Sequence, residues 1–396
     1  MQVEGLNFSA AIFESASGWT STGMTVVDVG TAYRLTLFWR SFLQYVGGAG
    51  LAIIMLSALV GVTGVGISSA EGRSDQLLPQ VHQSARLVLV MYITYAICGT
   101  FAYIFAGMPW FDAINHSLTA IATGGFSSIT ENFSAWNSLV IEWITIALML
   151  LGNLSFVTAW FLFRGQFRQV FRNPEVRLLL VMLPLVIALL TVFTFLPVYG
   201  SVGQALRHAS FESVAVLTTT GLSTVSFDTW NSFGFVTMIL LMIIGGGTCS
   251  TAGGIKQVRF YMVLKLIVWE IRRMCMPSKA ILECSIWGTN RPVYIDDAMA
   301  KRCLLFVFLY LLTILIGTFI LCACGLPFDR SLFEVASSIT SMGFTSGITS
   351  AQMPLAAIWT EIVAMILGRL ELFIIFTTFI KVWHDLARIF HRTSYR

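Results

Sequence analysis

Four short stretches of this 396-residue chain share one order of residue types: hydroxyl-bearing residues, a glycine, a bulky apolar residue and a further hydroxyl. In three of them a Phe-Glu pair precedes the stretch, and the glycine lies ten positions after the phenylalanine. These glycines are Gly23, Gly221 and Gly343. The fourth stretch follows Phe111-Asp112 at a looser spacing, which leaves Gly124 and Gly125 as alternative counterparts. Such self-similarity along one chain indicates a repeat architecture, here with four units.

The residue types in these stretches suit the binding of a dehydrated cation. Stripping a monovalent cation of its water costs on the order of tens of kcal/mol in a low-dielectric medium. Backbone carbonyl oxygens can replace that water when they point toward one axis. Such a backbone needs positive φ angles, which glycine adopts without steric cost, and hydroxyl oxygens add ligands that hard cations prefer. We therefore predict a cation filter formed by Ser21, Thr22, Gly23, Thr123, Gly124, Gly125, Thr219, Thr220, Gly221, Ser341, Met342 and Gly343.

A short helix is predicted before each stretch, at residues 8–18, 111–121, 205–217 and 331–340. Each helix is too short to cross a bilayer, and its carbonyl end would direct partial negative charge toward the filter. Acidic residues are expected at the starts of these half-helices, where they favour the helix dipole. They are Glu14, Asp112, Glu212 and Glu334. For any single stretch, a helix-packing glycine remains an alternative interpretation.

The composition indicates an integral membrane protein. Hydrophobic residues make up 56% of the chain and charged residues 11%, against roughly 25% charged residues in soluble domains. We predict an all-α membrane protein with four units, each a membrane helix, a pore loop and a second membrane helix, around a central pore. The chain has no HExxH or GxSxG motif, so we expect neither an enzyme nor a nucleic-acid partner. Apolar segments are expected to span at residues 35–62, 87–106, 138–163, 178–196, 303–324 and 355–380, with a further return helix starting near residue 233.

The predicted units divide the chain at residues 1–66, 67–163, 164–279 and 280–396, the last with a short tail. The first unit contains a half-helix and a return helix but no preceding span, so the sequence predicts a chain that begins within a repeat. Of its 24 Lys and Arg residues, 19 lie in segments away from the glycine turns. The positive-inside rule places those segments in the cytoplasm and the turns outside. The basic segments are 67–86, 164–177, 256–302 and 381–396.

The third unit contains a glycine-rich stretch within an apolar region. A helix is not expected there, because each glycine costs about 1 kcal/mol relative to alanine. Non-helical backbone at membrane depth must be buried in protein or line water, so we predict a gating loop, with a simple helix kink as the alternative. Its candidate residues are Gly245, Gly246, Gly247, Thr248, Ser250, Thr251, Gly253 and Gly254.

Charged or titratable residues at four further places have specific expected roles. Arg369 lies within an apolar segment, where a charge costs about 2.5–3.5 kcal/mol on insertion scales. It is expected to face the pore or a partner, with Glu361 and Glu371 as alternative partners. Arg40 is interpreted as structural or interfacial, and His116 as a packed side chain. Lys256, Arg259 and Lys265 are expected to face either anionic lipid or a regulatory partner.

The four turns resemble the selectivity-filter loops of the Trk/Ktr/HKT superfamily of potassium transporters. The stretch GGGTCSTAGGIK at residues 245–256 resembles the family's intramembrane loop, and LGRLELF at residues 367–373 resembles its Arg-bearing motif in the last helix. Phe38-Trp39-Arg40-Ser41, followed by Gly47-Gly48, favours the Trk-type branch. Glycine at all four filter centres matches the potassium-permeable members.

The resemblance implies uptake of K⁺ as the transported ion, without an organic cofactor, in the bacterial inner membrane. It also implies a homodimer and a cytoplasmic nucleotide-binding regulatory ring. Arg369 becomes a positive barrier beneath the filter, bonded to the loop at residues 245–254. The chain departs from the family at its N-terminus, where Trk-type members have further helices. A misassigned start, a truncated product, or a non-conducting regulatory or assembly subunit are therefore alternatives, and both channel-like permeation and symport stay open.

Overall fold

The computed structural model describes residues 4–58, 81–277, 283–288, 292–370 and 372–393. Helices dominate this part of the chain, and a short antiparallel hairpin of β1 (Ser285–Trp287) and β2 (Pro292–Tyr294) accompanies them. Three of the described helical segments are long and apolar enough to cross a membrane. The protein is therefore a mainly α-helical, multi-pass membrane protein. The three segments are Arg86–Phe105, Pro174–Tyr199 and Asp297–Ala323.

Four short helices occupy the positions predicted for the half-helices: α1 (Phe8–Trp19), α4 (Trp110–Ile121), α10 (Val202–Leu217) and α14 (Phe328–Thr340). Their starts follow local signals. The side chain of Asn7 accepts a hydrogen bond from the N–H of Ala10 at the start of α1, and prolines precede α4 and α14. At 1.5 Å per residue these helices are about 18–24 Å long, shorter than the roughly 30 Å hydrocarbon core.

Further helices flank the short ones. Three of them begin at clear N-caps, because Asn173 caps α8 ahead of Pro174, Asn231 caps α11 and Asp296 caps α13. The single π-helical turn η3 (Thr191–Phe195) continues α8 into α9 (Leu196–Tyr199). The flanking helices are α2 (Arg34–Ala58), α3 (Val81–Phe105), α5 (Leu139–Asn153), α8 (Pro174–Leu190), α11 (Ser232–Ile244), α12 (Gln257–Met274), α13 (Asp297–Ala323) and α15 (Leu355–Arg369).

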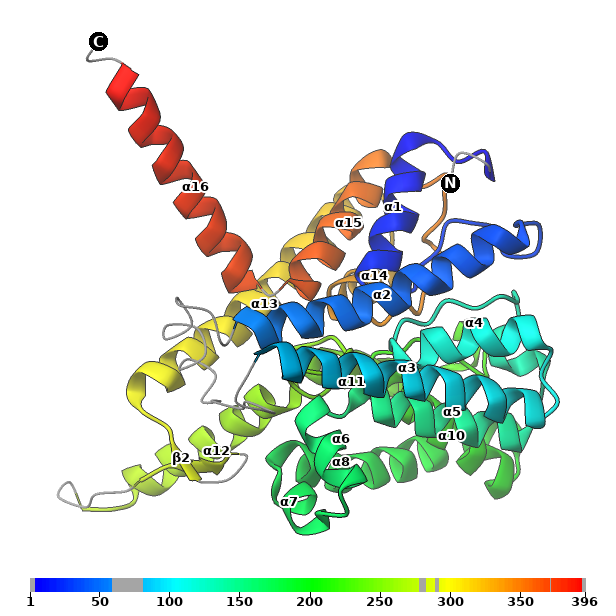
Figure 1. Ribbon diagram of the computed structural model, residues 1–396, viewed down its shortest axis with the longest axis horizontal. Coiled ribbons are helices and arrows are strands. Elements are labelled where there is room, and N and C mark those ends of the chain that lie inside the picture. The colour runs from blue at the N-terminus through cyan, green and yellow to red at the C-terminus, as the bar shows by residue number, and fades with distance from the viewer. Residues whose placement is uncertain (1–3, 59–80, 278–282, 289–291, 371, 394–396) are drawn as a thin grey trace.

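Two predicted spans differ from the structure. The expected span 138–163 is broken into α5 and α6 (Phe156–Phe163), which meet at a 117° bend. Ser155 caps α6 through the N–H of Thr158, so the chain restarts a helix in a new direction. The expected span 355–380 divides into α15 and α16 (Leu372–Thr393), and α16 projects from the body of the molecule (Figure 1).

Two of the basic segments contain regular structure. Segment 164–177 contains α7 (Phe167–Arg172), and segment 256–302 contains α12 and the β-hairpin. Short 3₁₀ turns η2 (Asn132–Ala135) and η4 (Phe227–Thr229) follow two of the glycine turns. The basic segment 67–86 lies largely outside the described residues.

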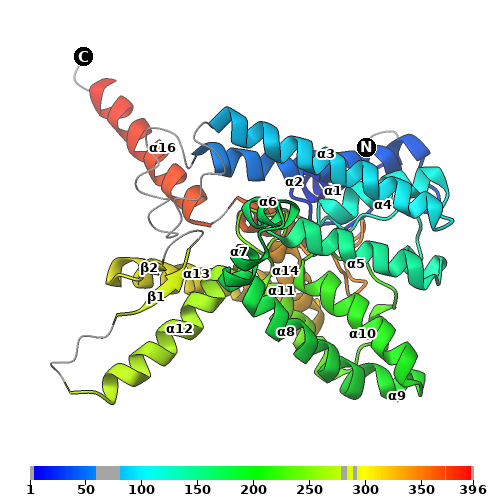
Figure 2. The same cartoon turned by 60° about the horizontal axis from the view of Figure 1, so that its bottom comes forward.

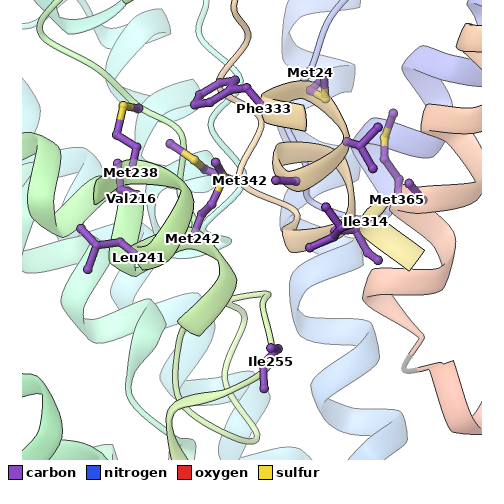
Figure 3. Packing of buried hydrophobic residues seen from close by; sticks show 14 of the residues in the cluster. Met24, Val216, Met238, Leu241, Met242, Ile255, Ile314, Phe333, Met342 and Met365 are labelled. Atoms are coloured by element: carbon purple, nitrogen blue, oxygen red, sulfur yellow. The ribbon is translucent and has the colours of Figure 1, made fainter. Parts of the chain in front are cut away.

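The short helices pack in a cycle. Helix α2 packs on α4, α5 on α10, α11 on α14, and α15 returns to α1. Each return helix therefore contacts the half-helix of the next predicted unit. A large apolar cluster fills the space between the third and fourth units, where Met342 lies beside Met242 of α11 (Figure 3). This packing brings the four glycine turns together.

Candidate cation-binding ring

All four half-helices end in the same backbone turn. A hydroxyl-bearing residue with positive φ follows each helix, and a glycine with positive φ follows two positions later. The N–H between them bonds back to the carbonyl five residues earlier, as Thr22 does to Ser17 at 2.9 Å, which completes a Schellman-type helix end. In the second unit Thr123 (φ +48) and Gly125 (φ +77) hold these positions, so Gly125, rather than Gly124, is the counterpart. The other pairs are Ser21 and Gly23, Thr219 and Gly221, and Ser341 and Gly343.

The four turns meet in a closed cycle, which we call the turn ring (residues 21–23, 123–125, 219–221 and 341–343). A Cβ atom added to each glycine would overlap the carbonyl oxygen of the neighbouring turn. These contacts join Gly23 to Gly124, Gly125 to Thr220, Gly221 to Met342, and Gly343 to Thr22. Glycine is therefore required at each centre for two reasons: it adopts the positive φ angle, and it leaves room for the carbonyl oxygen of the neighbouring turn.

The ring carbonyls have unequal surroundings. In the described part of the chain no protein donor bonds to the carbonyl oxygens of Thr22, Thr220 or Met342. The carbonyl oxygen of Gly124 accepts a hydrogen bond from the side-chain amide of Gln44, a fully buried residue of α2. Buried carbonyls are normally paired, so three of the four ring positions retain an oxygen that can coordinate a cation.

The hydroxyl groups of the ring serve mainly as braces. Thr22 bonds to Thr20 and Thr220 bonds to Thr218, both at 2.7 Å between the hydroxyl oxygens. The hydroxyl of Ser21 donates to the carbonyl oxygen of Gln44 at 3.1 Å. Met342 contributes its backbone, because its side chain is buried in the apolar cluster (Figure 3). Backbone carbonyls, more than hydroxyls, are therefore the available ligands.

The acidic residues do not lie at the helix starts, with the exception of Asp112. Glu14, Glu212 and Glu334 lie well inside their helices and are fully or almost fully buried. Each accepts a hydrogen bond from the N–H three residues after its ring glycine, at 3.0, 2.7 and 2.8 Å. Each also accepts from a nearby hydroxyl group, that of Thr25, Ser223 or Thr345. These carboxylates hold the chain as it leaves the ring.

His116 takes the corresponding position in the second unit. It lies nine residues before Gly125, as Glu14 lies nine residues before Gly23. Its Nε2 atom lies 3.1 Å from the hydroxyl oxygen of Ser127, and its ring packs edge-on against Phe133 and Trp136. The prediction of a packed histidine is confirmed, and the imidazole also replaces the carboxylate brace.

A cavity of about 550 Å³ opens beside the ring and is lined by all four ring glycines. The acidic residues Asp28 and Glu131, which follow two of the glycine turns, line its wall, whereas Asp228 is not among its lining residues. Arg40 also lines it, and its Nε atom lies 2.6 Å from Glu14 Oε1. The structural interpretation of Arg40 is confirmed by this buried pair and by its guanidinium 4.1 Å from the centre of the Phe126 ring.

The glycine-rich stretch is a folded loop and not a kink. Residues 245–254, which we call the inserted loop, are almost all buried and separate α11 from α12. The N–H of Gly253 donates to the hydroxyl of Thr219 at 2.7 Å, and the Thr251 hydroxyl lies 3.0 Å from the carbonyl oxygens of Ile121 and Gly152. The loop therefore lies directly against the ends of the half-helices.

The base of the inserted loop is anchored to two other helices. The N–H and the hydroxyl of Thr248 both donate to Glu175 Oε1 at 2.8 Å. The N–H of Gly247 lies 3.3 Å from both oxygens of Asn153, the backbone carbonyl and the side-chain amide. The remaining candidate residues Gly245, Gly246, Ser250 and Gly254 shape the loop, with φ of +70° at Gly245 and +79° at Gly254.

Arg369 joins the inserted loop to the first unit. It is 6% exposed, and its guanidinium donates to the carbonyl oxygen of Thr251 at 2.5 Å and reaches that of Gly47 at 3.5 Å. The alternative pair with Glu361 is wrong, because Glu361 accepts from Thr349 instead. Glu371, the other alternative, lies outside the described residues.

Comparison with known proteins identifies the family. A family model described as TrkH, a cation transport protein, matches residues 2–390. The chain belongs to the TrkH cation transport family. It is 32% identical to the Trk system potassium uptake protein TrkH of Halomonas elongata over 93% of this chain and 78% of that protein. It is 31% identical to the Trk system potassium uptake protein TrkG of Escherichia coli, over 93% and 77%.

A solved TrkH-family structure has the same fold. The crystal structure of the potassium transporter TrkH from Vibrio parahaemolyticus superposes with a TM-score of 0.83 at 27% identity. The match covers 94% of this chain and 78% of that one. The predicted family is therefore confirmed.

Sequence reasoning missed Gln44, Asn153 and Glu175. Each is a polar residue within or beside an apolar segment, and each is buried and bonded to the turn ring or the inserted loop. Polar residues at membrane depth are costly and are usually functional. The rule that points to Arg369 points to these three residues as well.

Proposed function

We propose that this chain takes up K⁺ across the plasma membrane and that the ions pass through the turn ring. The closed cycle of contacts between the four turns is the observation that carries the proposal. Carbonyl oxygens can replace the water around K⁺, and those of Thr22, Thr220 and Met342 have no donor in the described chain. The relatives named as potassium uptake proteins support K⁺ as the ion.

Under this proposal four units surround the ring, with the boundaries 1–66, 67–163, 164–279 and 280–396. The cyclic packing of each return helix on the next half-helix supports this division. The carbonyl ends of the four half-helices, directed toward the ring, would lower the energy of a cation there.

The inserted loop and Arg369 would form the gate. The loop contacts the ends of the half-helices, and the guanidinium of Arg369 holds its Thr251 carbonyl. A positive charge on this side of the ring opposes the passage of a cation, so permeation would require the loop and Arg369 to move. The resemblance adds a homodimer and a cytoplasmic nucleotide-binding ring as partners. Channel-like permeation and symport are both compatible with this arrangement.

Rubidium uptake tests the proposal directly. Cells that lack their own potassium transporters are expected to accumulate rubidium, and to grow at low K⁺, when they express this chain. Uptake no greater than in vector-only cells, with the chain present in the membrane, would contradict the proposal and favour a non-conducting subunit. Equal competition by excess Na⁺ and K⁺ would contradict the assignment of K⁺.

A further inference from the structure

A groove lies between two helices that diverge from each other. Its volume is about 570 Å³, within the range of roughly 300–1,000 Å³ that is common for ligand pockets. It is bounded by the first turns of α8, by one side of α12 and by the start of the β-hairpin. Figure 2 shows α8 and α12 separating along their lengths. We call this the α8–α12 groove.

One wall of the groove is apolar and open. Val181, Leu264 and Val268 line it, and these side chains are 71%, 42% and 49% exposed. Helix α8 belongs to a segment long and apolar enough to span the membrane. Val181 lies on that spanning segment, and Leu264 and Val268 lie on the neighbouring α12, so the wall adjoins a surface suited to lipid chains.

The rim of the groove is basic. It carries Arg177, Lys265 and Arg272 and a single carboxylate, Glu283. Lys265 and Arg272 lie on the same face of α12 as the apolar residues Leu264 and Val268, because these positions recur at helical spacing. Arg177 lies in the first turn of α8, where a spanning helix leaves the hydrocarbon region.

Two of the basic side chains are held at the groove by hydrogen bonds to backbone carbonyl oxygens. Each keeps further N–H groups that can donate to a ligand. The Nε atom of Arg177 donates to the carbonyl oxygen of Phe171 at 2.9 Å, which leaves both terminal nitrogens of its guanidinium. The ammonium of Lys265 donates to the carbonyl oxygen of Ser285 and has two further N–H groups. A phosphate group accepts hydrogen bonds from both side-chain types.

We propose that the α8–α12 groove binds an anionic phospholipid from the leaflet on the side of the basic loops. Its phosphate would contact Arg177, Lys265 and Arg272, and an acyl chain would lie along Val181, Leu264 and Val268. A soluble anion would leave the apolar wall unused, and a soluble protein would not reach the part of the wall that Val181 forms on the spanning segment. The bound lipid would steady α12, which continues directly from the inserted loop.

Native mass spectrometry of the purified, delipidated full chain tests this inference. With phosphatidylglycerol the wild type is expected to retain one lipid more tightly than with phosphatidylcholine. The variant R177Q/K265Q/R272Q should bind phosphatidylglycerol at least about tenfold more weakly, since each basic residue near a membrane surface contributes to anionic-lipid binding. The variant R164Q/R168Q/K301Q removes three charges outside the groove and should bind as the wild type does.

A second variant tests the apolar wall independently of the three cations. V181W/V268W fills the apolar wall and keeps all three cations, so it should lose the bound phosphatidylglycerol. Glycerol 3-phosphate, which is the headgroup without acyl chains, should not displace phosphatidylglycerol even at concentrations above that of the lipid. Equal losses in the groove and control triple variants, unchanged binding in V181W/V268W, or competition by glycerol 3-phosphate would each overturn the proposal.

Discussion

The side-chain amide of Gln44 donates to the carbonyl oxygen of Gly124, and its amide oxygen accepts from the N–H of Phe126 at 3.1 Å. A side chain at position 124 would overlap this carboxamide. Glycine at position 124, where the other turns have Thr22, Thr220 and Met342, therefore makes room for Gln44. One quarter of the turn ring is fixed by a side chain from the preceding unit, and the ring is not fourfold symmetric.

Replacing Gln44 by alanine should reduce ion discrimination. A buried hydrogen bond contributes about 1 kcal/mol, and 1–2 kcal/mol corresponds to about a five- to thirtyfold change in a ratio of populations. We expect the preference for rubidium over Na⁺ to fall within that range, measured as inhibition of rubidium uptake by Na⁺. Gln169→Ala, on α7 and away from the ring, serves as the control. An unchanged preference in Gln44→Ala would show that this bond does not position the ring.

Replacing Gly221 by serine should disrupt the ring. Position 221 has φ of +73°, and an added Cβ would overlap the carbonyl oxygen of Met342. We expect the K⁺ selectivity or the rubidium uptake of the variant to fall at least about tenfold, because the positive φ angle and the close carbonyl oxygen both exclude a side chain. Gly203→Ser, at the start of the same helix with open surroundings, should behave as the wild type. Wild-type selectivity in Gly221→Ser would contradict the filter assignment.

Replacing Arg369 by glutamine should increase uptake. The substitution removes the bond to Thr251 and the positive charge beside the inserted loop. Hydrogen bonds from charged groups contribute about 1.5–3 kcal/mol, so we expect initial rubidium uptake to rise about tenfold, with Arg369→Lys intermediate. Arg330→Gln, in the first turn of α14, is the control. Slower or unchanged uptake at equal expression would count against a gating role.

Removing one member of the buried Arg40–Glu14 pair should destabilise the protein. Both side chains are almost fully buried, at 1% and 0% exposure, and an unpaired buried charge costs about 3–5 kcal/mol. We expect Arg40→Gln to unfold at a clearly lower temperature in detergent, and Glu14→Gln/Arg40→Gln to recover part of the loss. Arg273→Gln breaks an exposed pair with Glu270 and should change the transition little. Additive losses in the double variant would show that the two groups do not interact.

Local signals predicted the half-helices and turns well. Prolines before α4 and α14, the Asn7 cap and the glycine at each turn act within a few residues, so their effects can be inferred from sequence. The family and the inserted loop could be predicted for a similar reason, because their motifs lie in short continuous stretches of sequence. The resemblance placed Arg369 against the loop, and the structure has that contact.

Pairings between distant segments were not predictable in the same way. Glu14 was assigned to a helix start, whereas its carboxylate reaches the backbone beyond the turn, at Val26. The bend between α5 and α6 lies in an apolar run, where the sequence favours a continuous helix, and the N–H of Phe156 bonds to Cys249 of the inserted loop. Such contacts depend on which segments fold together, which hydrophobic periodicity does not specify.

The contact of Gly343 with Thr22 closes the turn ring between positions 321 residues apart (343 − 22). A nascent chain that has emerged from the ribosome only through its third predicted unit contains three of the four turns. The ring is then still open. If K⁺ passes through the turn ring as proposed, ion passage would await synthesis of the last turn, and an unfinished chain would hold no closed ring through which K⁺ could leak.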